Sequence, residues 1–154
     1  MRNEAAGKEK MSAKQYLKRI WFLEGRVKRE KERIATLRAV LTGMKGIAYD
    51  ADKVQTSPSD PMSEKVGALV DLERKTMADI VALEEMKSET LSVIHTLDDE
   101  LMEQLLYLRY LHHKNFYEIS AEMNYSLRQL HKLHSKALRE IEERVHKSAH
   151  SDVL

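Results

Sequence analysis

The amino-acid sequence predicts an all-α protein, in which a long antiparallel helical hairpin (a coiled coil) precedes a C-terminal helix-turn-helix. Only five glycines and two prolines interrupt the 154 residues, and charged residues make up 33% against 6% aromatic, a composition typical of long thin helices. Apolar residues recur at helical spacing over two long stretches. Three successive helix-start signals then follow near the C-terminus.

The charge distribution supports this division. Residues 1–45 carry 13 basic and 5 acidic residues (+8), residues 46–104 carry 5 and 14 (−9), and residues 105–154 carry 8 and 6 (+2). The first two segments have opposite charge, so they can pair face to face. We therefore expect a disordered arm at 1–11, a coiled-coil hairpin at 12–97 with a linker near 45–61, a helix-turn-helix domain at 98–145 and a tail at 146–154.

The first long helix is expected from Ala13 to Leu41. Ser12 and Gln15 form a capping box at its start, and Gly43 with Gly46 supplies a stop. Its apolar residues fill the a and d positions of a heptad, in which only Glu30 is misplaced. They are Ile20, Leu23, Val27, Ile34, Leu37, Leu41 and Met44.

The second long helix is expected to begin with Asp60 as its cap and Pro61 in its first position. Its apolar stripe is looser than the first and is surrounded by acidic residues. The stripe consists of Val66, Leu69, Val70, Met77, Ile80, Leu83, Leu91, Ile94 and Leu97. Neither helix can bury its stripe alone, so an antiparallel hairpin is the economical arrangement, and pairing with another chain is equally allowed.

Three shorter helices are predicted after residue 97. Asp98 and Asp99 can cap the first, whose apolar face holds Leu101, Leu105, Leu108 and Leu111. Asn115 and Glu118 form a capping box for the second, with Phe116, Ile119 and Met123 inward. Asn124 suits a tight turn, and Ser126 with Gln129 caps the third helix, whose apolar positions are Leu127, Leu130, Leu133, Ala137, Leu138 and Ile141.

The polar face of the third helix is strongly basic. Arg128, Lys132, Lys136 and Arg139 recur at steps of three or four with no acid before Glu140. Gln129, His131 and Ser135 fill the gaps, so this face offers side chains that can reach both phosphates and base edges. A helix that is merely solvated usually mixes both signs of charge.

Several other functions receive no support. The absence of cysteine excludes disulfides and Cys-ligated metals, and no apolar run is long enough to span a bilayer, so we expect a cytoplasmic protein without a membrane partner. No catalytic residue, cofactor or metal ligand is assigned, and the protein is not expected to be an enzyme. His131 and His134 lack the further ligands that a metal site needs.

The C-terminal stretch LRYLHHKNFYEISAEMNYSLRQLHKLHSKAL resembles region 4 of the sigma-70 family. The match is carried by Leu108, Arg109, Tyr110, Glu118, Ile119, Ser126, Lys136, Ala137 and Leu138. With the preceding helices and the QTSPSDPM linker, residues 12–143 are similar to phage and prophage proteins of the ArpU and RinA late-gene regulator type. Two turn positions where the sigma pattern favours glycine hold His113 and Asn124, and His113 leaves the geometry of the first turn open.

The resemblance implies a DNA-binding transcription regulator of phage or prophage genes, with the third helix in the major groove. Double-stranded DNA is the expected partner, and RNA polymerase and a second copy of the chain are further candidates. Two alternatives stay open: a DNA-packaging protein similar to a small terminase subunit, and a protein interaction module. The candidate DNA-binding residues are Arg109, Ser126, Arg128, Gln129, His131, Lys132, Ser135 and Lys136.

Overall fold

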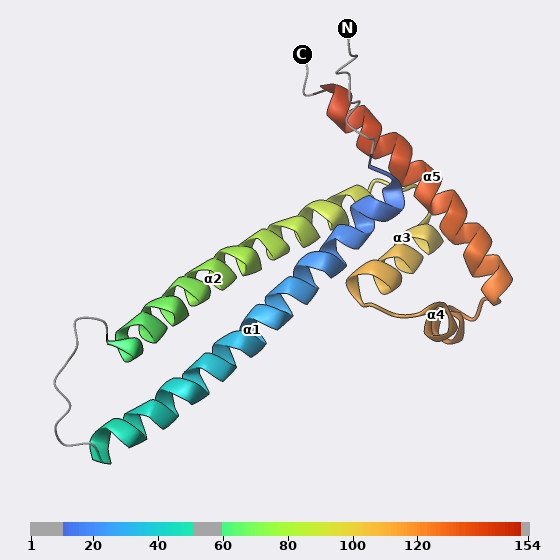
Figure 1. The fold of residues 1–154 in the computed structure, drawn as a ribbon. Helices are drawn as coiled ribbons and strands as arrows, with labels where there is room; N and C mark the ends of the chain where they lie inside the picture. Colours follow the sequence, from blue (N-terminus) through green and yellow to red (C-terminus); the bar gives the residue numbers. More distant parts are fainter. Residues whose placement is uncertain (1–10, 51–59, 152–154) are drawn as a thin grey trace, which may run out of the picture. The chain divides into compact units, whose positions relative to one another are not determined.

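A computed structural model describes residues 11–50 and 60–151 (Figure 1). The elements are α1 (Ala13–Asp50), α2 (Pro61–Ile94), α3 (Glu100–Leu106), a π-helical turn η1 (Tyr107–Leu111), α4 (Phe116–Met123) and α5 (Leu127–Ser151). Every element in this part of the chain is helical, as predicted. Most of the expected N-terminal arm, the middle of the linker and the last three residues lie outside the described residues.

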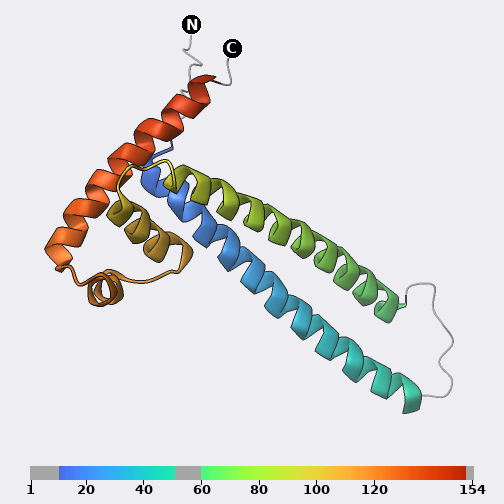
Figure 2. The same cartoon turned by 180° about the vertical axis from the view of Figure 1, so that it is seen from behind.

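The two long helices form the predicted antiparallel hairpin, lying side by side in both views (Figures 1 and 2). The predicted capping box begins α1: the Ser12 amide donates to Gln15 Oε1 (2.9 Å) and the Gln15 amide to Ser12 Oγ (3.2 Å). Asp60 caps α2 by accepting from the Met62 amide (3.0 Å), with Pro61 as the first helical residue. The start signals of both helices are confirmed.

The predicted end of the first helix is wrong. Helix α1 continues to Asp50, nine residues beyond Leu41, so the linker begins later than residue 45. A glycine inside a helix costs only about 1 kcal/mol and does not stop it unless the backbone turns left-handed. No described glycine has a positive φ angle. Gly43 and Gly46 therefore weaken the helix without ending it.

The described chain divides into two compact units. One contains the first turns of α1, up to Trp21, together with everything from Glu85 onward. The other spans residues 22–84 and holds the central part of the hairpin. The first turns of α1 and the end of α2 thus share a core with the C-terminal helices.

Residues 22–84 pack through a mixed apolar and polar seam. Leu23, Val27, Leu41 and Leu83 are buried, and so are Glu30 and Thr76. Arg26 pairs with Asp79 (2.8 Å) and Arg38 pairs with Glu73, so the basic first helix lies along the acidic second as expected. The misplaced Glu30 faces a cation of α2 instead, with Lys75 Nζ 3.1 Å from its Oε1.

Part of the expected stripe of α2 faces solvent. Val66, Val70 and Met77 are exposed by 43%, 45% and 61%, and Val81 by 52%. These side chains lie outside the buried part of the seam, which on α2 includes Thr76 and Leu83. Val66, Val70 and Met77 therefore do not pack within the hairpin, so the first of the two arrangements that the sequence allowed is corrected for this part of the stripe.

The other unit has two apolar clusters. The larger joins the first turns of α1 and the end of α2 to the C-terminal helices, and its buried members are Ala13, Tyr16, Leu17, Ile94, Leu97, Met102, Leu106, Tyr110, Ala137 and Ile141. The smaller consists of Leu105, Leu108, Ile119, Met123 and Leu130 and holds α4 against α3 and α5. Leu101 was expected on the inner face of α3 but is 37% exposed, because the buried face runs through Met102 and Leu105.

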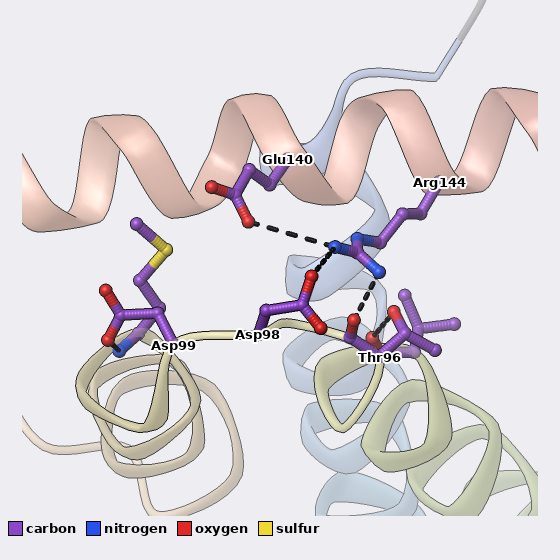
Figure 3. Close-up of polar contacts among 7 residues, drawn as sticks. Thr96, Asp98, Asp99, Glu140 and Arg144 are labelled. Atoms are coloured by element: carbon purple, nitrogen blue, oxygen red, sulfur yellow. Dashed lines mark hydrogen bonds and ion pairs between the residues drawn. The ribbon is translucent and has the colours of Figure 1, made fainter.

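The two predicted caps of α3 have different roles (Figure 3). Asp99 is the N-cap and accepts from the amides of Leu101 (2.9 Å) and Met102 (3.3 Å). Asp98 instead faces Arg144 of α5, whose guanidinium lies 3.8 Å away and also donates to the Thr96 carbonyl.

In the described ranges, no helix is both long and apolar enough to cross a membrane.

Candidate nucleic-acid interface

Helices α4 and α5 are joined by a three-residue turn whose geometry follows from local side chains. Asn115 and Glu118 close the predicted capping box at the start of α4 (2.8 and 2.9 Å). Asn124 ends α4 in the left-handed conformation, with φ 57° and ψ 38°. Ser120 Oγ donates to the Tyr125 carbonyl across the turn (2.6 Å). The turn is thus fixed from both sides.

The start of α5 is capped as predicted. The Ser126 amide donates to Gln129 Oε1 (2.9 Å), and the Gln129 amide donates to Ser126 Oγ (3.2 Å). Both side chains are exposed, yet each already has a bond to the backbone. Their first role is therefore to hold the helix start, and any contact with a ligand comes in addition to it.

The outer face of α5 is open and basic. Its side chains line one shallow groove and consist of Arg128, His131, Lys132, Ser135, Lys136 and Arg139. All six residues are exposed. Across residues 11–44 and 60–148, none of the four cations on this face has a carboxylate within ion-pair distance. The groove therefore presents uncompensated positive charge to solvent, which attracts polyanions.

Arg109 is not part of this face. Its guanidinium lies between two aromatic rings, 4.9 Å from the centre of Trp21 and 5.2 Å from that of Phe116. Nη1 also donates to the Lys114 carbonyl (3.0 Å). These contacts brace the segment between η1 and α4, so the side chain predicted to contact phosphate is placed here to support the turn.

The two histidines of α5 have different surroundings. His131 is exposed and packs on Phe116, with ring centres 4.5 Å apart. His134 is turned inward, and the Tyr110 hydroxyl lies 2.9 Å from its Nε2. Burial lowers the pKa of His134 to about 4, helped by the cations Lys14 and Arg109 and by His131. His134 is therefore neutral at pH 7 and shares a hydrogen bond with the Tyr110 hydroxyl.

Sequence reasoning missed the residues that hold α1 to this unit. Trp21 Nε1 donates to the Tyr110 carbonyl (3.0 Å), and the two rings stack with centres 5.2 Å apart. The signal was the run of apolar residues at the start of α1, where Tyr16, Leu17 and Trp21 widen the face beyond the heptad seam. Nothing in the periodicity of the sequence predicted the π-helical turn that carries Tyr110.

Two residues with left-handed backbone flank α4. His113 has a φ angle of 56°, and among the described residues only His113 and Asn124 are non-glycine residues with positive φ. Both residues thus adopt the conformation that glycine tolerates best.

A comparison of the chain with models of known protein families gives no match, and comparisons with curated proteins and with solved structures give no significant match. The described residues also contain no group of three or more His, Asp or Glu side chains placed to hold a metal ion. We therefore infer the function from the geometry of α4 and α5 and from their charges.

Proposed function

We propose that the chain is a sequence-specific DNA-binding transcription regulator, in which α4 and α5 form a helix-turn-helix and α5 enters the major groove. The observation that carries the proposal is the exposed row of unpaired cations on α5. The resemblance of the chain's sequence to sigma region 4 and to phage and prophage late-gene regulators suggests which class of gene it regulates.

The separation of the two faces of α5 supports this function. Leu130, Ala137 and Ile141 are fully buried, so the helix is held by its inner side while the outer side stays accessible. The major groove of B-DNA is about 12 Å wide and admits one α-helix. A helix anchored along one side and basic along the other has the form that such a groove accepts.

Position along α5 suggests different roles for its side chains. Residues near the start of a recognition helix meet base edges, and those farther along meet the backbone. Arg128, Gln129, His131 and Lys132 are thus the candidates for reading bases, and Ser135 with Lys136 for contacting phosphates. Arg139 continues the same face and is a further candidate for contacting phosphates. Arg109, in contrast, supports the turn.

The test is the affinity of the purified chain for host and phage promoter fragments, measured across a salt series. Arg128→Ala should cost about 1–3 kcal/mol on the preferred site and little on random DNA if Arg128 reads a guanine. Lys136→Ala should weaken binding to both DNAs alike and reduce the salt slope by about one unit.

Arg33→Ala is the matched control, because it removes one exposed positive charge from the central part of α1. It should leave both affinities and the salt slope unchanged. Equal losses with Arg33→Ala and Lys136→Ala would mean that net charge alone drives binding. Absence of salt-dependent DNA affinity would contradict the proposal and favour the interaction module.

A further inference from the structure

Helix α2 carries an exposed apolar stripe that the hairpin does not use. Its members are Val66, Val70, Met77 and Val81, with exposed fractions of 43–61%. At 3.6 residues per turn, the four positions fall within about 60° of one another around the helix. Such an aligned set on a helix with a charged remainder is typical of an interface.

The spacing of the stripe is symmetrical. Val66 and Val81 lie equally far from the point between residues 73 and 74, and so do Val70 and Met77. A two-fold interface places one patch against itself, so that residue i contacts residue j and j contacts i. Two antiparallel copies of α2 related by an axis at that point would bring Val66 against Val81 and Val70 against Met77.

The residues at the centre fit this pairing. Glu73 and Arg74 stand on either side of the symmetry point, so each lies level with the opposite charge of the other copy. Glu73 is already compensated by Arg38 of its own chain. Met77 of the stripe and the neighbouring Ile80 also line an open groove of about 440 Å³ with Ile34 and Ala35 of α1. This groove leaves room for side chains of a second helix.

We propose that this stripe is the docking surface for a second copy of the chain, with the two α2 helices antiparallel and the two-fold axis between Glu73 and Arg74. The occupant is another copy because the spacing is self-complementary, a property that a different partner would not require. The proposal is independent of DNA binding, since all of its residues lie within 22–84.

The first experiment measures the mass of the full chain in solution by sedimentation over a range of concentrations. We expect a dimer that Val70→Glu and Met77→Glu each convert to a monomer, with helix content unchanged because both positions are exposed in the single chain. Phe22→Glu is the matched control: Phe22 is 76% exposed but lies on α1, and this variant should remain dimeric.

The second experiment uses the absence of cysteine from the sequence. Chains with Val70→Cys are mixed with chains carrying Met77→Cys and oxidised. We expect the mixed disulfide to form at least tenfold faster than either self-pair, because residue 70 lies opposite residue 77 of the other copy and about 10 Å along the helix from its own equivalent.

A chain that stays monomeric at all concentrations would overturn the proposal and assign the stripe to a different partner. A trimer or ring would also overturn it, since a single two-fold axis closes at two copies. The same holds for a dimer that Phe22→Glu dissociates and Met77→Glu does not, or for cross-linking without preference for the mixed pair.

Discussion

The cations of the hairpin and the cations of α5 differ in their partners. In residues 22–84, Arg26 and Arg38 of α1 each face a carboxylate of α2. The charges are reversed at Glu30 of α1, whose carboxylate faces the cation Lys75 of α2. On α5, the four cations from Arg128 to Arg139 have no such neighbour among the described residues. The first set is satisfied within the fold, and the second is available to a ligand.

This difference separates charges that serve structure from charges that serve binding. A cation that compensates a buried carboxylate contributes to stability, because its loss leaves an unpaired charge in a poorly hydrated place. A cation without a partner contributes almost nothing to stability and can be removed without harm to the fold. Removing a paired cation of the hairpin should therefore lower stability and leave DNA affinity unchanged. Removing a cation of α5 should lower DNA affinity and leave stability unchanged.

The largest effect on stability is expected at Glu30. The Glu30 residue is only 8% exposed and has Lys75 as its cation, so Lys75→Ala should cost about 1–3 kcal/mol of unfolding free energy. Lys132→Ala, which removes an exposed cation of α5, should stay within about 0.5 kcal/mol of the parent. Urea unfolding followed by circular dichroism measures both.

A second variant shows whether the buried charge is the cause. The double change Glu30→Leu with Lys75→Ala should restore stability to at least that of the parent, because an apolar residue in the seam needs no counter-charge. If Lys75→Ala and Lys132→Ala unfold at the same urea concentration, the contrast between the two regions does not hold at this pair.

The next effect is a pH dependence that depends on His134. Its pKa is about 4 in the folded chain against 6.5 in the unfolded chain, so the unfolded chain binds the proton first as the pH falls. The contribution of His134 to the free energy of unfolding is therefore fully present above about pH 6.5. It is lost as the pH falls toward 4, which lowers this free energy by about 1–2 kcal/mol after allowance for solvent screening.

His134→Gln keeps a side chain that can hydrogen-bond to the Tyr110 hydroxyl but cannot be protonated in this pH range. Its thermal unfolding temperature should fall less between pH 7 and pH 4.5 than that of the parent. His95→Gln serves as the comparison, because it removes an exposed histidine of the same chain, whose Nδ1 lies 3.2 Å from Glu103 Oε2. An unchanged pH profile in His134→Gln would show that other groups dominate the titration.

The smallest effect is expected from the two Ser–Gln capping boxes, at the starts of α1 and α5, which share their residue types and distances. Ser12→Ala and Ser126→Ala should each cost about 1 kcal/mol of stability. Only Ser126→Ala should also weaken the proposed DNA binding, because a phosphate at the start of α5 would meet the backbone donors there. Equal DNA affinity of the two variants would separate the start of α5 from the interface.

Local signals predicted the elements well and their surroundings poorly. Three capping boxes, Asp60 with Pro61, and Asn124 all mark real helix boundaries, because capping depends on residues within three or four positions. The end of α1 was misplaced because glycine destabilises a helix by an amount that its continuation can offset. Exposure of Val66 and Met77 depends on where α1 lies, which periodicity along α2 does not record.

The same limit applies to the candidate site. The basic face of α5 could be predicted because exposed cations and buried leucines alternate at helical spacing. The role of Arg109 could not, because the rings that enclose it come from Trp21, far away in the sequence, and from Phe116 across a turn. A side chain placed by distant parts of the chain needs the fold before its role can be assigned.

The position of Trp21 makes the molecule convenient to observe. It is the only tryptophan in the sequence, and its ring is in contact with Tyr110, His113 and Arg109. Its fluorescence therefore reports on the environment of the unit that contains the C-terminal helices. Residues 22–84 contain no tryptophan, so unfolding of that unit alone is not expected to change the emission directly. Comparing the emission with the circular dichroism of the long helices would reveal whether the two units unfold together or one after the other.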